Sequence, residues 1–423
     1  MVEPLDLGRA PPCALNLLHS KADETSVNST RWMLLSLPLV LMSVSANSAS
    51  PEAIKSLPRL LLKEKTQIQI DKQHRAKTRV QSAFLIQTPE GQAPKVRILV
   101  YDQNLVRMNS FRAWTAIGKE RVSVTDKMLV KAQLNEEEGF SNLVSMEVTF
   151  PKMVVGAEIH WEYEIEEIEK PHLGYFSELV RLDQEYYSPG SVQVSIKSAV
   201  PLRWKVQDGS GTWKTTSGKN TLDLFLAKEF NQILNDEPNG VVSLQRLPTV
   251  LVSTGDKWQN VGQEVWVGLE SRLKEPLTPF EQKIVKKAKS HKGVVNQVQV
   301  AMSEMNRQLR YMGEWRGRFS QFMPRSAQVI SEGQYGDCKD YALIATRILR
   351  KLGMDASMAS IYSDPEMIPD FYYSLPSKLF NHQIVHIRQG NKVFWMDPTH
   401  FESLHFIDPT LAGRMALVWG RKT

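Results

Sequence analysis

The period of the hydrophobic and polar positions changes partway along the chain. Between about residues 63 and 228, apolar and polar residues alternate over short segments, most regularly in AEIHWEYEIEE (157–167). A period of two places successive side chains on opposite faces of a strand, so this pattern predicts strands with one buried face. SVQVSIKSAV (191–200) repeats the pattern, and TWKTTSGKNTLDLFL predicts a hairpin around Ser217–Asn220. Several short strands at this spacing predict a β-sandwich.

Charged side chains occupy the second face of segment 157–167. The apolar face would carry Ile159, Trp161, Tyr163 and Ile165, and the opposite face Glu158, His160, Glu162 and Glu164. We interpret this acidic face as a solvated surface. The alternatives are an acidic functional patch and a docking face for basic helices later in the chain.

Helical periodicity begins beyond NDEPNGVVSLQRLPTV (235–250), a stretch rich in turn formers. LTPFEQKIVKKAKS predicts a helix with Thr278 as its N-cap, Pro279 at its first position and Glu281 completing a capping box. A second helix is predicted over about 292–310, where apolar residues recur at helical spacing. Basic residues dominate the polar positions of both helices, which we interpret as a solvated face.

An apolar run at residues 32–44 is followed by small residues. It is shorter than the ~20 residues that a membrane-spanning helix needs. The run matches the apolar core of a secretory signal peptide with cleavage between Ala46 and Ala49. We therefore predict an exported chain, periplasmic or secreted, without an integral membrane span after cleavage. Met33 is a candidate start, and a buried hydrophobic helix is the alternative interpretation of the run.

A chain of 423 residues is long enough for two or three domains. We predict a leader over residues 1–49, a β-sandwich domain over 50–237 and a second domain over 238–423. The net charge of +6 is modest for this length, and the sequence lacks zinc-finger spacing, a Walker loop and a dinucleotide fingerprint. We therefore predict neither a nucleic-acid partner nor a cofactor.

The chain has only two cysteines, Cys13 and Cys338. Cleavage of the leader would remove Cys13, so the mature chain would keep one thiol and no internal disulfide. In an oxidising compartment a lone thiol is a liability unless it is buried or used. After YGDC, apolar residues recur at helical spacing up to Leu352, and Gly353 is a natural residue to end a helix. The pattern therefore places Cys338 in the first turn of a helix, with Gly336 allowing a close backbone approach before it.

A helix start changes the chemistry of a thiol. It carries unpaired backbone N–H groups and about half a positive charge, and both favour a thiolate over a thiol. A thiolate attacks carbonyl carbon, and the same N–H groups can hold the resulting oxyanion. The alternative is that Cys338 is a small core residue. We interpret Lys339 and Asp340 as residues that cap or solvate the helix start.

LFNHQIVHIRQGNKVFWMDPTH (379–400) predicts two strands around a tight turn at Gly390–Asn391. That register brings His382 opposite or diagonal to Asp397. A carboxylate so placed fixes the tautomer of an imidazole and stabilises imidazolium. His386 is a rival base on the same strand face. A metal site at the two histidines, or a zinc site that also uses Cys338, is the further alternative, although we predict no metal.

At these residues the chain resembles the transglutaminase-like superfamily of cysteine acyl transferases and hydrolases. The resemblance rests on YGDCKD, FNHQIVHI and FWMDPT, in the order Cys, His, Asp. RYMGEWRGRFSQFMPRSAQVISEGQYGDCKD and LPTVLVST resemble a bacterial subgroup in which this domain follows an N-terminal β domain of unknown function. The resemblance implies an α+β chain whose second domain has a papain-like transglutaminase fold. It implies Cys338 as nucleophile, His382 as general base and acid, and Asp397 as the orienting group.

The sequence departs from the subgroup in two places. Tyr341 stands where the subgroup commonly has Lys, and the chain ends at Thr423 without the further C-terminal domain often seen there. In relatives a side chain upstream of the Cys supplies a second oxyanion donor. Candidates for it here are Gln321, Trp315 and Tyr335.

The sequence as a whole predicts an exported thiol enzyme that cleaves or transfers acyl groups at amide or peptide bonds through an acyl-enzyme. Its partner would be a protein or peptide substrate, such as one in the cell envelope. Hydrolysis and transfer use the same residues up to the acyl-enzyme, so both stay open. The alternative is a non-catalytic envelope binding or assembly module that retains the triad.

Overall fold

The computed structural model describes residues 2–4, 51–93, 95–133, 139–171, 173–182, 186–231, 245, 247–261, 263–316, 322–363, 368–400 and 411–420. The predicted apolar run, Cys13 and the turn-rich stretch before residue 245 lie outside these residues. The described chain is mixed, with strands dominating before Asn231 and helices and strands combined after it. This confirms the predicted α+β composition and the strand-rich N-terminal region.

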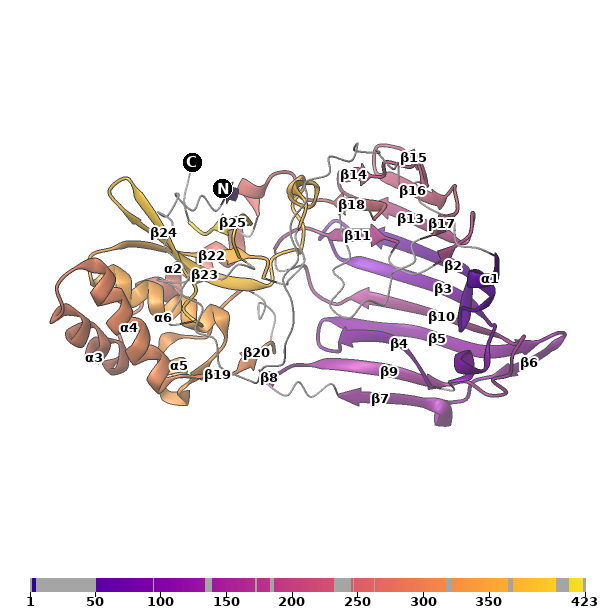
Figure 1. Cartoon of the computed structure of the whole chain (residues 1–423), viewed down its shortest axis with the longest axis horizontal. Helices are drawn as coiled ribbons and strands as arrows, with labels where there is room; N and C mark the ends of the chain where they lie inside the picture. Colours follow the sequence, from indigo (N-terminus) through magenta and orange to yellow (C-terminus); the bar gives the residue numbers. More distant parts are fainter. Residues whose placement is uncertain are drawn as a thin grey trace, which may run out of the picture.

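An eight-stranded sheet forms the centre of the strand-rich part (Figure 1). In spatial order it contains β15 (Trp213–Ser217), β16 (Thr221–Leu226), β13 (Val192–Ser198), β2 (Arg59–Ile70), β3 (Ala76–Ile86), β10 (Glu158–Glu167), β5 (Val106–Ile117) and β6 (Glu120–Ser123). Only β13 and β2 pair in parallel; the other neighbours are antiparallel. The predicted hairpin around Ser217–Asn220 is the turn between β15 and β16.

Two smaller sheets accompany the large one. They contain β11 (Ser177–Arg181), β18 (Thr249–Ser253) and β14 (Arg203–Gln207) in one case, and β4 (Lys95–Asp102), β9 (Leu143–Thr149) and β7 (Leu129–Gln133) in the other. Val250 and Val252 of β18 share a buried cluster with β2, β13 and β16. Val148 of β9 shares another with β3, β5 and β10. The apolar faces of the strands are thus buried between layers, as the period of two predicts.

The acidic face of β10 is neutralised within its own sheet. Glu162 pairs with Arg112 at 2.6 Å, Glu164 with Lys77 at 2.8 Å and Glu166 with Arg107 at 3.1 Å. The cations come from β3 and β5, which flank β10 on both sides. Because the neighbouring strands already supply the counter-charge, this face needs no basic helix to dock on it.

The second part of the chain is built around one antiparallel sheet. Its order is β1 (Val2–Pro4), β25 (Met415–Val418), β22 (Asp355–Ile361), β23 (His382–Gln389) and β24 (Lys392–Met396). Its helices are α2 (Gln263–Lys274), α3 (Pro279–Lys289), α4 (Val294–Gln308), α5 (Ala327–Gly333) and α6 (Cys338–Lys351). The remaining elements are α1 (Pro51–Lys55) and the strand pairs β8 (Gly139–Phe140) with β20 (Gly313–Glu314), β12 (Tyr186–Tyr187) with β17 (Phe230–Asn231), and β19 (Arg310–Tyr311) with β21 (Tyr335–Gly336).

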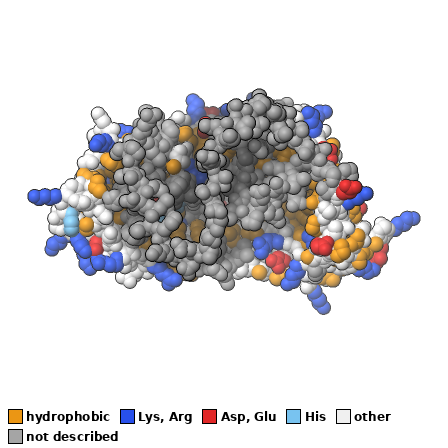
Figure 2. All heavy atoms as spheres, in the orientation of Figure 1, with side chains coloured by type: hydrophobic (Ala, Val, Ile, Leu, Met, Phe, Trp, Pro, Cys, Tyr) orange, Lys and Arg blue, Asp and Glu red, His pale blue; other side chains and the backbone are white. Residues whose placement is uncertain are grey.

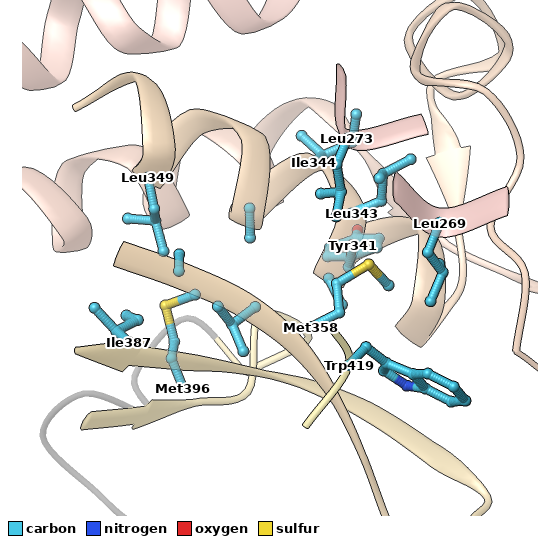
Figure 3. Close-up of a cluster of buried hydrophobic side chains, with 14 of the residues drawn as sticks. Leu269, Leu273, Tyr341, Leu343, Ile344, Leu349, Met358, Ile387, Met396 and Trp419 are labelled. Atoms are coloured by element: carbon cyan, nitrogen blue, oxygen red, sulfur yellow. The ribbon is translucent and has the colours of Figure 1, made fainter. Parts of the chain in front are cut away.

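Helix α6 is the central element of this second part. It packs on β22 and β23 and contacts α2, α3, α4 and α5. Figure 3 shows Leu349, Ile387 and Met396 meeting between the helix and the sheet. Every residue from Lys339 to Leu349 is buried. The sequence predicts a helix with one apolar face, whereas the helix is enclosed on all sides, and its polar residues are held by specific partners.

Arg347 is the clearest of these buried polar residues. Its guanidinium lies 2.6 Å from Glu281 and donates to the carbonyls of Arg272 in the last turn of helix α2 and of Glu275 and Pro276 just after it. Glu281 also completes the predicted capping box with Thr278 at the start of α3. The Glu281 carboxylate therefore caps α3 and also neutralises Arg347. Among the described residues of α6 beyond its first turn, Arg347 is the only buried cation.

Basic side chains gather at the end of the molecule formed by α3 and α4 (Figure 2). Helix α3 exposes Lys283, Lys286 and Lys289 while burying Ile284 and Val285, which agrees with the predicted solvated face. No described helix is long and apolar enough to cross a membrane.

Candidate active site

Cys338 is the first residue of α6, and its position follows from a local capping motif. Asp337 is the N-cap, and its Oδ1 accepts the backbone N–H of Asp340 at 3.3 Å. The Asp340 carboxylate in turn accepts the N–H of Asp337 at 3.4 Å. Such a reciprocal box satisfies two N–H groups that a helix start otherwise leaves unpaired. Cys338 itself stays partly exposed, whereas the residues that follow it are buried.

Gly336 makes room for this cap. A Cβ on Gly336 would lie 2.8 Å from the Cβ of Asp340, closer than real side chains approach. The close backbone approach predicted before the cysteine is therefore present. A larger residue at this position would push Asp340 away from the helix start.

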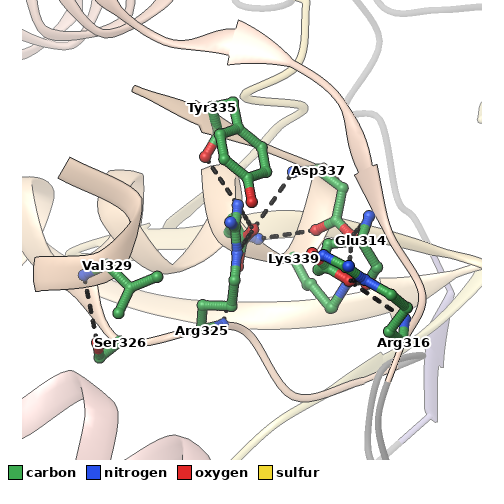
Figure 4. A network of polar contacts seen from close by, with 9 residues as sticks. Glu314, Arg316, Arg325, Ser326, Val329, Tyr335, Asp337 and Lys339 are labelled. Atoms are coloured by element: carbon green, nitrogen blue, oxygen red, sulfur yellow. Dashed lines mark hydrogen bonds and ion pairs between the residues drawn. The ribbon is translucent and has the colours of Figure 1, made fainter. Parts of the chain in front are cut away.

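A buried polar network surrounds the cap (Figure 4). Lys339 is almost fully buried, and its ammonium contacts the Asp337 carboxylate and donates to the Glu314 carbonyl at 2.8 Å. Arg325 donates to Asp340 at 2.7 Å and to the Tyr335 carbonyl at 2.7 Å. Asp340 thus caps the helix as predicted, but Lys339 is buried against Asp337 rather than solvated.

Burial dominates the titration of Asp337. It raises the pKa of the Asp337 carboxyl above its usual value, and the nearby Asp340 adds to the rise, although the Lys339 ammonium opposes it. The cap is therefore a closely balanced set of charges directly before the cysteine.

His382 and Asp397 meet at the same end of the second sheet. Strands β23 and β24 pair with Val385 opposite Met396 and turn at Gly390–Asn391, as predicted. Asp397 follows β24 directly and lies diagonal to His382, the first residue of β23. His382 Nε2 lies 2.7 Å from Asp397 Oδ2. Thr399 fixes the carboxylate by donating its N–H and hydroxyl to Oδ1 at 2.9 and 2.6 Å.

The side chain of Cys338 also lies close enough to the His382 imidazole to help raise the pKa of His382. Because Nε2 is engaged by Asp397, Nδ1 is the ring nitrogen left for the sulfur. The structure thus brings Cys338, His382 and Asp397 into one chain of contacts. The three residues come from a helix start, a strand start and a strand end that are far apart in sequence.

The environment of this group shifts two pKa values in opposite directions. Burial alone would lower the pKa of His382, but the hydrogen bonds and charges of Asp397 and Cys338 outweigh it and raise the pKa to about 10. Burial alone would raise the pKa of Asp397, but bonds from His382, His400 and Thr399 hold it well below its usual range. The pair therefore holds imidazolium against carboxylate at neutral pH.

His386 has a different environment from His382. It is fully buried, and its ring lies edge-on against Trp395, its cross-strand neighbour, with the ring centroids 4.7 Å apart. Among the described residues, no group of three or more His, Cys, Asp or Glu side chains is arranged to hold a metal ion.

Of the three candidates for a second oxyanion donor, the structure describes two, and both rings pack against other residues. The Trp315 indole lies on Gly139 and Gly313, where an added Cβ would come within 2.6 Å of it. The Tyr335 ring lies under the Arg325 guanidinium at 4.1 Å and edge-on to Phe140 at 6.2 Å. Gln321 belongs to the residues that the structure does not describe.

Tyr311 lies beside Cys338 instead, and no sequence pattern predicts this neighbour. Its phenol is close enough to the Cys338 backbone N–H and to the Cys338 side chain for both to affect the pKa of Tyr311. This contact depends on the parallel pairing of β19 with β21, which places Tyr311 opposite Gly336. Each strand is two residues long, so no local period reveals the pairing.

Comparisons with known proteins bear on the fold more than on this site. Residues 72–223 match a domain family of unknown function with a solved structure, DUF3857; the match ends before Cys338. No curated protein matches the chain. The fold is similar to that of a candidate protease from Parabacteroides distasonis, with a TM-score of 0.61 and 14% identity over 80% of this chain and 67% of that chain. At that identity the likeness shows the fold alone.

Two further solved structures share less of the geometry. A candidate cysteine protease from Cytophaga hutchinsonii aligns with 86% of this chain and 84% of its own, at 10% identity and a TM-score of 0.24. A structure named TGase aligns with 49% of this chain and 51% of its own, at 11% identity and a TM-score of 0.22. This chain therefore spans about half the length of that TGase.

Proposed function

We propose that the chain is a thiol enzyme of the transglutaminase-like type, which acts at amide or peptide bonds through an acyl-enzyme. One observation carries the proposal: His382 Nε2 lies 2.7 Å from Asp397, and Cys338 at the start of α6 lies close enough to His382 to help raise its pKa. A nucleophile, a base and an orienting carboxylate in this order are the parts that covalent acyl transfer needs. Cys338 is partly exposed, so a substrate carbonyl has access to it.

The first half of the reaction makes a thioester. The Cys338 thiolate attacks the carbonyl carbon, a C–S bond forms, and the carbonyl electron pair moves to oxygen. The backbone N–H of Cys338 stabilises this oxyanion. When the oxyanion collapses, the C–N bond breaks and the His382 imidazolium gives its proton to the leaving amine.

The second half releases the acyl group. Neutral His382 takes a proton from water or from a second amine, which attacks the thioester carbon. The C–S bond then breaks, and the acid or new amide leaves with the thiolate and imidazolium restored. Asp397 holds His382 in one orientation throughout and stabilises its positive form. The raised pKa of His382, about 10, supports this scheme because the proton for the amine is in place before the substrate binds.

The substrate class that fits is a protein or peptide, because the proposed reaction attacks the carbonyl carbon of an amide bond. We also propose that the chain is exported, which rests on the apolar run at residues 32–44. Expression of the full chain followed by mass spectrometry of the envelope fraction tests export. A mature N-terminus between residues 47 and 50 supports it, and an intact leader in the cytosol contradicts it.

Acylation by p-nitrophenyl acetate tests the activity. A burst of p-nitrophenolate equal to the enzyme concentration, with an acetyl group on Cys338 by mass spectrometry, is expected. Cys338→Ala should abolish the burst, and His382→Ala should slow it by about 10²-fold or more. His291→Ala, at the exposed end of α3, is the matched control and should leave it unchanged. Acetylation that persists in Cys338→Ala, or no burst from the folded wild type, would refute the activity and favour a binding module.

A further inference from the structure

Tyr311 is held beside the cysteine by backbone hydrogen bonds on both sides of it. Arg310 donates its N–H to the Gln334 carbonyl, and Met312 donates its N–H to the Gly336 carbonyl, each at 2.9 Å. These bonds fix β19 alongside β21, the segment that leads directly into the cap of α6. The Cα of Tyr311 therefore has a set position relative to Cys338, and its side chain adjusts mainly by rotation about its own bonds.

The Tyr311 side chain lies across the helix start. Its ring centroid is 6.0 Å from that of Tyr341, at an angle of 54°. The residue is 44% exposed, and its phenol lies close to the Cys338 backbone N–H. The capping box does not use this N–H, so Tyr311 brings a partly exposed ring and a hydroxyl near an N–H that is left for a substrate.

That N–H is the one on which an oxyanion would form. When a thiolate attacks a carbonyl, the carbonyl oxygen becomes an anion next to the backbone N–H of the nucleophile. The phenol of Tyr311 lies beside this N–H in the free protein. A hydroxyl both accepts and donates hydrogen bonds. When a substrate oxygen accepts the N–H, the adjacent phenol can donate its O–H to the same oxygen.

We propose that Tyr311 is the second oxyanion donor of the Cys338 site, an assignment that rests on the proposed acyl-transfer function. It adds a fourth candidate to the three residues predicted from the sequence for this role, and Gln321 among them lies outside the described residues. Two donors from different elements, the N–H of α6 and the O–H of β19, would converge on one oxygen.

The protonation of Tyr311 supports a donor. Burial around the hydroxyl and the negative charges of Cys338, Asp337 and Asp397 raise the pKa of Tyr311 above its usual value, against a smaller opposing effect of the Cys338 N–H. The phenol therefore keeps its proton over the whole working pH range. It remains a neutral donor that does not repel the thiolate.

The test compares two reactions of Cys338, one that forms an oxyanion and one that does not. Acylation of Cys338 by p-nitrophenyl acetate passes through a tetrahedral oxyanion, whereas alkylation by iodoacetamide is a direct displacement at carbon. Tyr311→Phe keeps the ring against Tyr341 and removes only the hydroxyl. We expect the burst rate constant to fall about 10²-fold and the iodoacetamide rate to stay within about twofold of wild type.

Tyr335→Phe is the matched control, because its ring is engaged by Arg325 and its hydroxyl is the rival candidate. We expect it to acylate at the wild-type rate. A second measurement uses the inhibitor acetyl-phenylalaninal, which forms a hemithioacetal; its inhibition constant should weaken by a similar factor in Tyr311→Phe. A weaker inhibition constant in Tyr311→Phe, together with an unchanged midpoint of its thermal unfolding, separates loss of the donor from loss of the fold.

The outcomes distinguish the two proposals. A wild-type burst with an equal or faster burst in Tyr311→Phe overturns the role of Tyr311 and leaves the acyl-transfer function standing. A parallel loss of acylation and alkylation also overturns it, because a structural defect would slow both. The absence of any burst from the wild type overturns the function, and the assignment of Tyr311 with it.

Discussion

Replacing Asp397 by Asn would test how the charge and the hydrogen bonds of this residue act on His382. The carboxylate uses Oδ1 for two bonds from Thr399 and Oδ2 for the bond with His382. An amide has one oxygen acceptor and one NH₂ donor, so it cannot reproduce both sides. The two Thr399 bonds favour keeping oxygen on their side, which turns the NH₂ toward His382 Nε2. His382 would then carry its only proton on Nδ1, next to Cys338, and imidazolium would be disfavoured.

The magnitude follows from the pKa of His382, which is raised from 6.5 to about 10. At about 1.4 kcal/mol per unit, this difference is on the order of 5 kcal/mol in favour of imidazolium, shared between Asp397 and Cys338. Assigning about half of it to Asp397 predicts a loss of roughly 2–3 kcal/mol, or about 10²-fold in the population of the thiolate–imidazolium pair near neutral pH.

The assay is the rate of Cys338 alkylation by iodoacetamide as a function of pH. Asp397→Asn should react about 10²-fold more slowly at pH 6, and the pH of its half-maximal rate should rise. His400→Ala is the control, since His400 lies 3.4 Å from the same carboxylate oxygen but its side chain is 66% exposed. We expect it to stay within about threefold of wild type. If Asp397→Asn reacts at the wild-type rate at pH 6, the coupling of Asp397 to the thiolate is refuted.

Three further predictions concern stability. Glu281→Gln leaves the buried Arg347 without its carboxylate, so the free energy of unfolding in urea should fall by about 3–5 kcal/mol. The control is Glu270→Gln at the exposed Lys274 pair, which should change the free energy of unfolding by less than about 1 kcal/mol. Equal losses in the two variants would contradict the argument. Gly313→Ala puts a Cβ 2.2 Å from the Trp315 ring, so the free energy of unfolding should fall by about 1–3 kcal/mol. Gly209→Ala is the control, because an added Cβ there meets open space. An unchanged free energy of unfolding in Gly313→Ala would show that the indole is not fixed there. The pKa of His382 is raised in the folded state, so the contribution of imidazolium to folding stability is full below about pH 6.5 and is lost as pH rises toward 10. The difference in free energy of unfolding between wild type and His382→Ala should therefore shrink over that range. A difference that widens would contradict this sign.

Local features of the fold could be predicted from the sequence. The capping box at Thr278, the tight turn at Gly390–Asn391 and the helix beginning at Cys338 are present because each depends on residues within a few positions of one another. The relation of His382 to Asp397 follows from the hairpin register alone. Two of the three residues of the proposed triad are therefore fixed by a short segment, and the third by a helix start.

Features that depend on distant pairings could not be predicted. Tyr311 meets Cys338 through a two-residue parallel bridge, and Arg347 finds Glu281 across 66 positions of the sequence. β18, which follows the predicted boundary, is the middle strand of a sheet with β11 and β14. No sequence period or motif predicts such contacts, because the local sequence around each of these residues is that of an ordinary strand, loop or helix.

The strand-rich part connects physically to the start of α6. β8 pairs in parallel with β20, and the backbone N–H of Trp315 donates to the Phe140 carbonyl at 2.8 Å. The Trp315 indole fills the space that Gly139 and Gly313 leave open. The next link is the Glu314 N–H, which donates to Asp337 at 3.1 Å. Asp337 is the N-cap that sets the position of Cys338. A displacement of β8 would therefore reach the nucleophile through two hydrogen-bonded steps, so the first part of the chain helps to hold the geometry on which the chemistry of the second part depends.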